Sequence, residues 1–291
     1  MIDRATGVAN SGQTVHASGL HLTFGEPTTS AIRRRSLASR PMIYDPWFYA
    51  AAVPAMIALG LAKGGFSAIG FLVVPIMAIT ISPITAAGIT LPIMIISDIV
   101  ALVLYRNAFD GRTLVIMLPG ALLGILIGWL AAAWVNEDLI RLIVGLLAVL
   151  FSLSYWLSAA RRQAPASHDA RKGVFWGTVA GFTSFVSHAG GPPYQMYVAP
   201  LRLSPTVFAG THVIMFAVMN TVKVVPFFML GQLSATSLST SAVLLTVSVP
   251  MTFAGAALVR RFETAAYYRL VYALMLLVGI YLIADAFVSI F

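Results

Sequence analysis

Two long apolar stretches of this chain carry the same helix-breaking residues in the same order. Each stretch opens with a glycine pair and then shows a proline, a Ser-Pro pair and an Ala-Gly pair. The first stretch has them at Gly64-Gly65, Pro75, Ser82-Pro83 and Ala87-Gly88, and the second at Gly190-Gly191, Pro200, Ser204-Pro205 and Ala209-Gly210. From Ser82 and Ser204 onward the two runs correspond at a constant offset of 122 residues. Paired apolar segments with glycine and proline breaks in corresponding positions of two halves point to the binding site of a secondary transporter.

The composition places these stretches in a membrane. Hydrophobic residues make up 59% of the chain and charged residues only 10%, with a mean hydropathy of +0.90, whereas a soluble domain carries about 25% charged residues. The formal net charge is +8, but most of the basic residues lie in short loops between apolar runs, as the positive-inside rule expects. The excess charge therefore indicates membrane topology and not a nucleic-acid partner.

The apolar segments predict an all-α polytopic membrane protein with about eight transmembrane segments. A spanning helix needs about 20 apolar residues. Six segments are long enough to cross alone, namely 84–105, 113–134, 139–160, 206–230, 238–258 and 266–290. The other four are short and form two pairs, each split at a glycine-rich break: 47–62 with 66–80, and 173–187 with 192–201. We expect both breaks inside the bundle, because backbone groups freed in lipid must find partners in protein or water.

The order of breaks divides the chain into two related halves. We expect a first transmembrane repeat over 43–160, a basic cytoplasmic linker over 161–172, and a second transmembrane repeat over 173–291. Residues 1–41 are rich in Ser, Thr and Gly without an apolar core, which predicts a disordered tail. A native start at Met42 is an alternative that would make this tail an over-called extension.

The loop charges indicate that the two repeats are inverted. Loop 106–112 carries two arginines and one aspartate, whereas its counterpart 231–237 carries no charge. Loop 135–138 carries two carboxylates, whereas its counterpart 260–265 carries two arginines and one glutamate. Equivalent loops of an inverted repeat face opposite sides of the membrane, so the bias is expected to swap in this way. The basic run 33–40 argues against this orientation unless translation starts after it.

The residues at the two breaks form the predicted substrate site. A lysine ammonium beside loosened backbone N–H groups can hold an anion, and a histidine can bind an oxyanion or relay a proton. The competing interpretations are a lysine that reaches the membrane interface and a neutral histidine satisfied by the backbone. The predicted substrate-binding residues are Lys63, Gly64, Gly65, Ser67, His188, Gly190, Gly191 and Tyr194.

Four more polar residues fall within long apolar segments and are candidates for coupling or charge pairing. They are Asp98, His212, Asn220 and Lys223. Asp98 and Asn220 are repeat equivalents, and Asp98 has Lys63, Lys223 or His212 as candidate partners. Ionisable residues inside a membrane are costly and are functional hypotheses by default. The alternatives are a structural ion pair for Asp98 and an interfacial anchor for Lys223.

Several chemistries have no signal in the sequence. The chain has no cysteine and no GxxxxGK[ST] phosphate loop, GxSxG elbow or HExxH zinc helix, so we expect neither an enzyme nor a cofactor. His188 and His212 lack carboxylate neighbours at metal spacing, so no metal site is expected.

At its two breaks the chain resembles the sulfite exporter TauE/SafE family, also called the toluene-sulfonate uptake permease family. The resemblance covers about 43–290 and is carried by Gly60 to Gly70 (GLAKGGFSAIG) with Val74-Pro75, and by Gly181-Phe182-Thr183-Ser184 with His188-Ala189-Gly190-Gly191-Pro192-Pro193. Many members have longer glycine runs than Gly64-Gly65, a difference that bears on selectivity. The resemblance implies a bacterial inner-membrane permease for sulfite, sulfonates or related organosulfur anions.

The sequence thus favours a secondary transporter of small anions that works by alternating access around the two broken helices. A passive anion channel and a non-transporting membrane subunit are the alternatives. The expected partners are a small anion and the lipid bilayer. A coupling proton or other ion, and a homo-oligomer, are compatible with the sequence, and import and export both stay open.

Overall fold

The computed structural model describes residue 43, residues 45–131, 137–157 and 165–290, so the predicted tail at 1–41 and part of the linker lie outside the described residues. Residues 41–291 form one compact unit. The described part consists of α-helices and short 3-10 helices without a strand, which confirms an all-α polytopic membrane protein. Its elements are α2 (Pro46–Lys63), η1 (Ser67–Leu72), α3 (Val73–Ala78), α4 (Pro83–Tyr105), α5 (Gly111–Ala131), α6 (Glu137–Leu157), α7 (Ala170–Ser187), α8 (Gly191–Val198), η3 (Ala199–Leu201), α9 (Pro205–Met229), α10 (Ala235–Val259) and α11 (Thr264–Ile290).

Six helices of the described part are long and apolar enough to cross a membrane by length and composition. They are α2, α4, α5, α9, α10 and α11. The set differs from the six segments that the sequence singles out, because α2 qualifies over its full 18 residues whereas the apolar part of α6 within the described residues is shorter. The total of eight spans stays a prediction.

The helices begin where the sequence supplies capping groups. The Asp45 carboxylate accepts a hydrogen bond from the backbone N–H of Trp47 at the start of α2, and the Ser82 hydroxyl accepts one from Thr85 N–H at the start of α4. Proline occupies the first position of α4 and of α9, where its missing N–H costs nothing. The Ser-Pro pairs of the two halves thus start corresponding helices.

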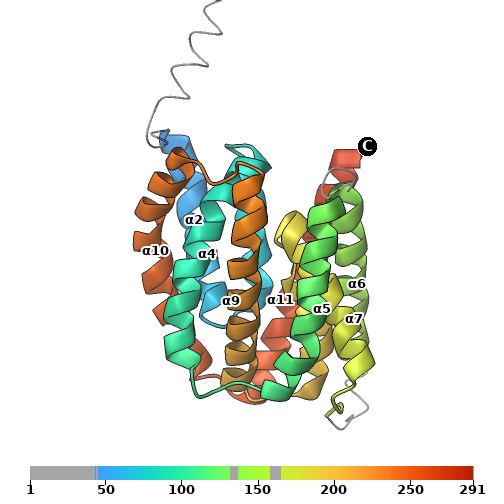
Figure 1. Ribbon diagram of the computed structural model, residues 1–291. Helices are drawn as coiled ribbons and strands as arrows, with labels where there is room; N and C mark the ends of the chain where they lie inside the picture. The colour runs from blue at the N-terminus through green and yellow to red at the C-terminus, as the bar shows by residue number, and fades with distance from the viewer. Residues whose placement is uncertain (1–42, 44, 132–136, 158–164, 291) are drawn as a thin grey trace, which may run out of the picture. The chain divides into compact units, whose positions relative to one another are not determined.

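The packing of the helices is reciprocal between the two halves of the chain. Helix α5 packs on α7 and α10 packs on α2, while α4 lies against α9 and α6 against α11 (Figure 1). If α2, α4, α5 and α6 correspond to α7, α9, α10 and α11, each of these contacts maps onto another or onto itself. This exchange is what two repeats related by a two-fold axis require, and we propose that relation for the two halves.

Two glycines of the predicted repeat make equivalent contacts. A Cβ at Gly88 in α4 would overlap the carbonyl oxygen of Gln232, in the loop between α9 and α10. A Cβ at Gly210 in α9 would overlap the carbonyl oxygen of Ala108, in the loop between α4 and α5. Each helix therefore presses a glycine against the loop that follows its counterpart, and no larger residue fits at either place.

Several basic loops lie together at one end of the helices. His168 Nε2 lies 2.6 Å from Asp110 Oδ2, and Arg260 donates a hydrogen bond of 2.9 Å to the Leu104 carbonyl. These contacts join the end of α4, the linker and the α10–α11 loop. The basic side chains of this region are Arg106, Arg112, Arg171, Lys172, Arg202, Arg260 and Arg261. We refer to this region as the basic end.

Candidate functional site

The first break is held by two tyrosine hydroxyls. Helix α2 ends at Lys63, and the chain turns through Gly65, whose φ of 128° is accessible to glycine and strained for other residues, before η1 begins. The Gly64 carbonyl accepts a hydrogen bond of 2.6 Å from Tyr105, and the Gly65 carbonyl accepts one of 2.7 Å from Tyr267. The break is buried, and its freed carbonyls are satisfied by α4 and α11, as a membrane interior requires.

The second break turns at a histidine. Helix α7 ends at Ser187, and the next residue, His188, adopts the left-handed conformation with φ 54° and ψ 20°, a backbone state uncommon for a non-glycine residue. The Thr183 hydroxyl donates to the Ala189 carbonyl at 3.2 Å, and Ala189 N–H donates back to the Thr183 carbonyl at 3.1 Å. Helix α8 then starts at Gly191, and Pro192 and Pro193 supply no N–H to its first turn.

Helix α9 contributes a polar stripe to the region between the breaks. His212, Phe216, Asn220 and Lys223 follow each other at spacings of four, four and three residues, which places them on one face of a helix. All four side chains are buried. The stripe runs from the part of α9 near the basic end towards the middle of the bundle.

A cavity of about 30 Å³ lies where the breaks and this stripe meet. That volume is enough for a few water-sized bodies, since one water needs roughly 10–15 Å³ on the same measure. Its walls come from α2, η1, α4, α7, α8 and α9. The lining residues are Leu59, Ala62, Lys63, Ser67, Gly70, Met94, Ser184, His188, Gly191, His212, Phe216, Asn220 and Lys223.

Lys63 and Asp98 form a buried ion pair at the cavity. Lys63 Nζ lies 2.6 Å from Asp98 Oδ1. Asn220 Nδ2 donates to the other carboxylate oxygen of Asp98 at 2.7 Å. Asp98 and Asn220 are separated by 122 residues, the offset of the sequence repeat. Equivalent positions of the two halves are therefore in direct contact, with a carboxylate on one side and an amide on the other.

Lys223 is a second buried cation in the same cavity wall. Its ammonium donates to the Ser184 hydroxyl at 3.1 Å and to the Ser184 carbonyl at 3.2 Å. No carboxylate lies within ion-pair distance of it among the residues that the structure describes. The side chain is fully buried and that of Lys63 is 4% exposed, so the interpretation of either lysine as an interfacial anchor is wrong. Lys63 at the end of α2 and Lys223 in α9 both face the interior of the bundle, so their ammonium groups lie inside it.

Several polar atoms around the cavity have no hydrogen-bond partner within the described part of the chain. They are both ring nitrogens of His188, Nδ1 of His212, Oδ1 of Asn220 and Oε1 of Gln195. Buried polar groups without partners are rare in folded proteins. Here they surround a cavity that also holds two lysines, so a polar ligand or water would find both donors and acceptors.

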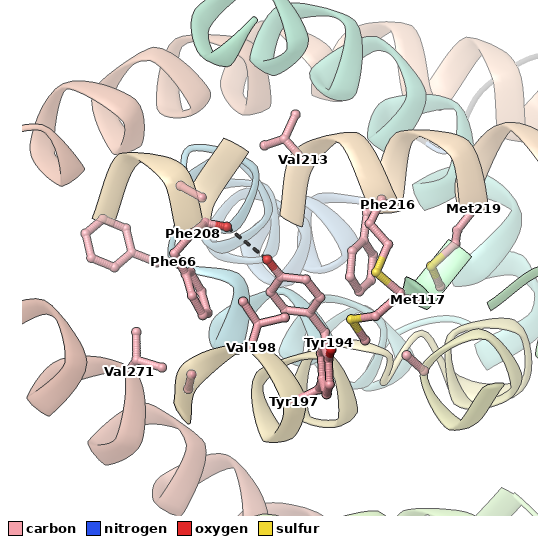
Figure 2. Close-up of a cluster of buried hydrophobic side chains, with 14 of the residues drawn as sticks. Phe66, Met117, Tyr194, Tyr197, Val198, Phe208, Val213, Phe216, Met219 and Val271 are labelled. Carbon is pink, nitrogen blue, oxygen red and sulfur yellow. Dashed lines mark hydrogen bonds between the residues drawn. The ribbon is translucent and has the colours of Figure 1, made fainter. Parts of the chain in front are cut away.

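An aromatic cluster lies between the cavity and the basic end. The Tyr194 ring makes edge contacts with Phe208, His212 and Phe216, and its hydroxyl donates to the Phe208 carbonyl at 2.9 Å (Figure 2). Phe208 in turn contacts Tyr267 by a T-shaped edge. Because Phe208 lies in the first turn of α9 and His212 one turn further, the Phe208 side of the cluster is nearer to the basic end than the cavity wall is.

The structure brings most of the predicted site residues together. The cavity wall contains Lys63, Ser67, His188, Gly191, His212, Asn220 and Lys223. The other predicted residues lie behind this wall. Asp98 holds Lys63, Gly64 and Gly65 pack against α10 and the tyrosines, Gly190 lies against α7, and Tyr194 belongs to the aromatic cluster.

Six lining residues lie outside the predicted site: Leu59, Ala62, Gly70, Met94, Ser184 and Phe216. Ser184 lies one turn before His188 on α7, and Phe216 lies one turn after His212 on α9. The four-residue spacing to a predicted site residue was the available signal in both cases. Within the described ranges no group of three or more His, Cys, Asp and Glu side chains could hold a metal ion, and no feature of the cavity points to a cofactor.

A second polar cluster lies outside the membrane-spanning segments, at the start of α5. The Asp110 carboxylate accepts hydrogen bonds from the Thr113 hydroxyl and backbone N–H, and it faces His168. Partial burial raises the pKa of Asp110, but the Thr113 hydrogen bonds and the His168 contact outweigh it and hold the pKa below its ordinary value. Asp110 N–H also donates to the Thr211 hydroxyl at 2.8 Å, which ties this loop to α9.

The comparisons with known proteins agree with this architecture. The family model described as "Sulfite exporter TauE/SafE" matches residues 52–282, from within α2 to within α11. The comparisons with curated proteins and with solved structures return no match. The matched span includes both breaks, the ion pair and the polar stripe of α9. The chain therefore belongs to the sulfite exporter TauE/SafE family of membrane transporters.

Proposed function

We propose that this protein is a secondary transporter of small anions, namely sulfite, sulfonates or related organosulfur compounds. The observation that carries the proposal is a buried cavity with two lysine ammonium groups at the meeting point of two broken helix pairs. Family membership supports membrane transport, and the chemistry of the cavity supports an anion as the cargo.

The energetics of the site argue for ligand binding. Among the described residues Lys223 donates to one neutral serine, and a buried ammonium without a counter-charge costs several kcal/mol. A subunit that served only as an anchor would gain nothing from this arrangement, since an apolar side chain at position 223 would avoid the desolvation cost of a buried charge. A bound anion would offset the cost of burying this ammonium in every transport cycle.

The positions of the two breaks support an alternating-access mechanism. One broken pair belongs to each half, and the cavity lies between them, as in transporters built from inverted repeats. On this proposal the aromatic cluster around Tyr194 and Phe208 closes the path to the basic end, since its rings pack against each other on that side of His212. We infer that the basic end is cytoplasmic, because Lys and Arg are enriched in cytoplasmic loops. For the anion to exchange between the cavity and the cytoplasm, the side chains of this aromatic cluster would have to separate.

Anion flux into proteoliposomes tests the proposal. We expect Lys63→Ala to lose most sulfite or methanesulfonate uptake, because it removes a cation from the cavity wall. The matched control is Lys172→Ala, which removes an exposed lysine of the basic end and should keep full flux. Full flux in Lys63→Ala would exclude the proposed role of that lysine.

Two further readouts separate the alternatives. Accumulation against an anion gradient, driven by a proton or sodium gradient, distinguishes a transporter from a passive channel. The absence of any flux would favour a non-transporting subunit. Coupling to protons through His188 or Asp98 predicts that His188→Gln changes the pH dependence of uptake, and an unchanged pH profile would remove His188 from the coupling path.

A further inference from the structure

The cavity region has an uneven charge count. Three charged side chains are buried among the described residues at this site: Lys63, Asp98 and Lys223. Lys63 and Asp98 neutralise each other at 2.6 Å. Lys223 is left with the hydroxyl and carbonyl of Ser184. The side chains at this site therefore carry a net charge of +1, from two cations and one anion.

The other titratable groups that face the site do not change this count. His188 contacts the Phe227 ring edge-on, and His212 stacks on Phe216 at 4.2 Å. Neither histidine has a carboxylate partner in the described part of the chain, so we count both as neutral. The hydroxyl of Tyr194, the nearest tyrosine, donates to the Phe208 carbonyl and remains a neutral phenol.

The excess charge comes from one broken equivalence between the halves. Asp98 in α4 corresponds to Asn220 in α9, and the two side chains hydrogen-bond to each other. A carboxylate at both positions would give Lys223 a counter-charge and leave the site neutral. The amide of Asn220 instead leaves Lys223 without a carboxylate partner among the described residues, and its N–H₂ donates to the carboxylate that pairs with Lys63.

From this charge count we propose that the cavity selects a monoanion, of the sulfonate or hydrogensulfite class, over a dianion of similar shape such as sulfate, so that sulfite binds in its singly protonated form. The inference rests on the proposed function and names the charge of its cargo. One negative charge makes the loaded site neutral, whereas two would leave a net negative charge in a region shielded from water. Uncompensated charge is strongly disfavoured in such surroundings.

A pair of probes with the same shape and different charge tests the proposal on the unmodified protein. Methanesulfonate is a monoanion at every accessible pH, whereas methylphosphonate is a monoanion in mild acid and becomes a dianion above neutral pH. We would measure the Kd of both for the purified full chain in detergent by titration calorimetry at pH 6 and pH 8.5. Taking the ratio of the two Kd values cancels every pH effect that acts equally on both probes.

We expect the ratio of methylphosphonate Kd to methanesulfonate Kd to rise about fivefold between the two pH values, in step with the loss of the methylphosphonate monoanion. A ratio that stays constant would overturn the monoanion inference while leaving anion transport intact. Binding of neither probe, together with no binding of sulfite, would instead overturn the proposed function.

A variant provides an independent check. Asp98→Asn removes the negative charge of the site at nearly constant volume, so the excess charge rises to two. We expect the Kd ratio at pH 8.5 to shift at least tenfold towards methylphosphonate. An unshifted ratio in a variant that elutes as a folded species in size-exclusion chromatography would overturn the charge-count argument. If the variant does not fold, the pH experiment on the unmodified chain decides the matter.

Discussion

The contact between Lys63 and Asp98 allows the structural and the functional roles of one ion pair to be separated. Their charged atoms lie 2.6 Å apart, which corresponds to a Coulomb attraction of about 6 kcal/mol at an effective dielectric constant of ~20. Removing one partner of a buried pair costs about 3–5 kcal/mol, because the other charge is left without compensation. We expect Lys63→Met and Asp98→Asn each to destabilise the protein by roughly that amount.

The two single variants should differ in how an anion affects them. In Lys63→Met, Asp98 keeps the Asn220 hydrogen bond, and the site has no excess positive charge. In Asp98→Asn, Lys63 and Lys223 share the cavity without a carboxylate. Added methanesulfonate should therefore raise the unfolding temperature of Asp98→Asn more than that of the unmodified protein, and it should have little effect on Lys63→Met.

The double variant Lys63→Met/Asp98→Asn is the decisive one. It removes both charges, so we expect a coupling energy of at least about 2 kcal/mol in a double-mutant cycle of unfolding in detergent. It should regain stability without regaining flux in proteoliposomes, because Lys63, one of the two lysines that line the cavity, is gone. The exposed pair of Lys172 and Asp169, 4.0 Å apart, is the control and should couple by about 0.5 kcal/mol or less.

Two results would refute the reasoning. A coupling energy as small as that of the exposed control would mean that the two buried charges do not depend on each other. Restored flux in the double variant would mean that the pair only holds α2 against α4, and that Lys63 is not needed to bind the anion.

Three shorter predictions concern other parts of the fold. Hydrogen bonds at the start of α5 outweigh the partial burial of Asp110 and hold its pKa below the ordinary value. The ionised Asp110 therefore stabilises the fold at pH values above that ordinary pKa, and this stabilisation is lost as the pH falls through the folded-state pKa. Asp110→Asn should flatten the acid limb of the curve of stability against pH, and an unchanged limb would contradict this. Gly181→Ala should destabilise the protein by about 1–3 kcal/mol or more, measured by thermal unfolding, because the new Cβ would overlap the Ala121 carbonyl oxygen and separate α7 from α5. Tyr267→Phe leaves the Gly65 carbonyl without its 2.7 Å donor and should cost about 1–3 kcal/mol, whereas an unchanged unfolding temperature would show that another donor replaces it.

The sequence predicted the helices well because lipid leaves few alternatives. The segment expected at 206–230 is Pro205–Met229, and the one at 84–105 is Pro83–Tyr105. Backbone groups in a bilayer must be satisfied within the segment, so hydropathy and the Ser-Pro pairs are sufficient to place such helices. The breaks were predictable from the adjacent glycines at the head of each half, because a lone proline does not end a helix here: Pro92 lies within α4 and Pro226 within α9.

The side-chain partners were predictable only in part. Asp98 had three candidate partners in the sequence, and the choice of Lys63 depends on how α2 and α4 are rotated against each other. Lys223 was expected to act as an anchor if it lay at the end of its helix, but α9 continues to Met229 and buries it. The tyrosines that satisfy Gly64 and Gly65 lie 41 and 202 residues away, and nothing local in the sequence indicates them.

The contact between Asp98 and Asn220 explains why two related halves need one unlike pair. Helices α4 and α9 meet at equivalent positions, so whatever stands at these positions must bond to its own counterpart. Two carboxylates there would repel each other, and two amides would leave Lys63 without a counter-charge. With one carboxylate and one amide, Asp98 accepts from both Asn220 and Lys63, and Lys223 is left without a carboxylate partner among the described residues. The requirement for a stable contact between the halves and the requirement for an anion site are thus met by the same asymmetry.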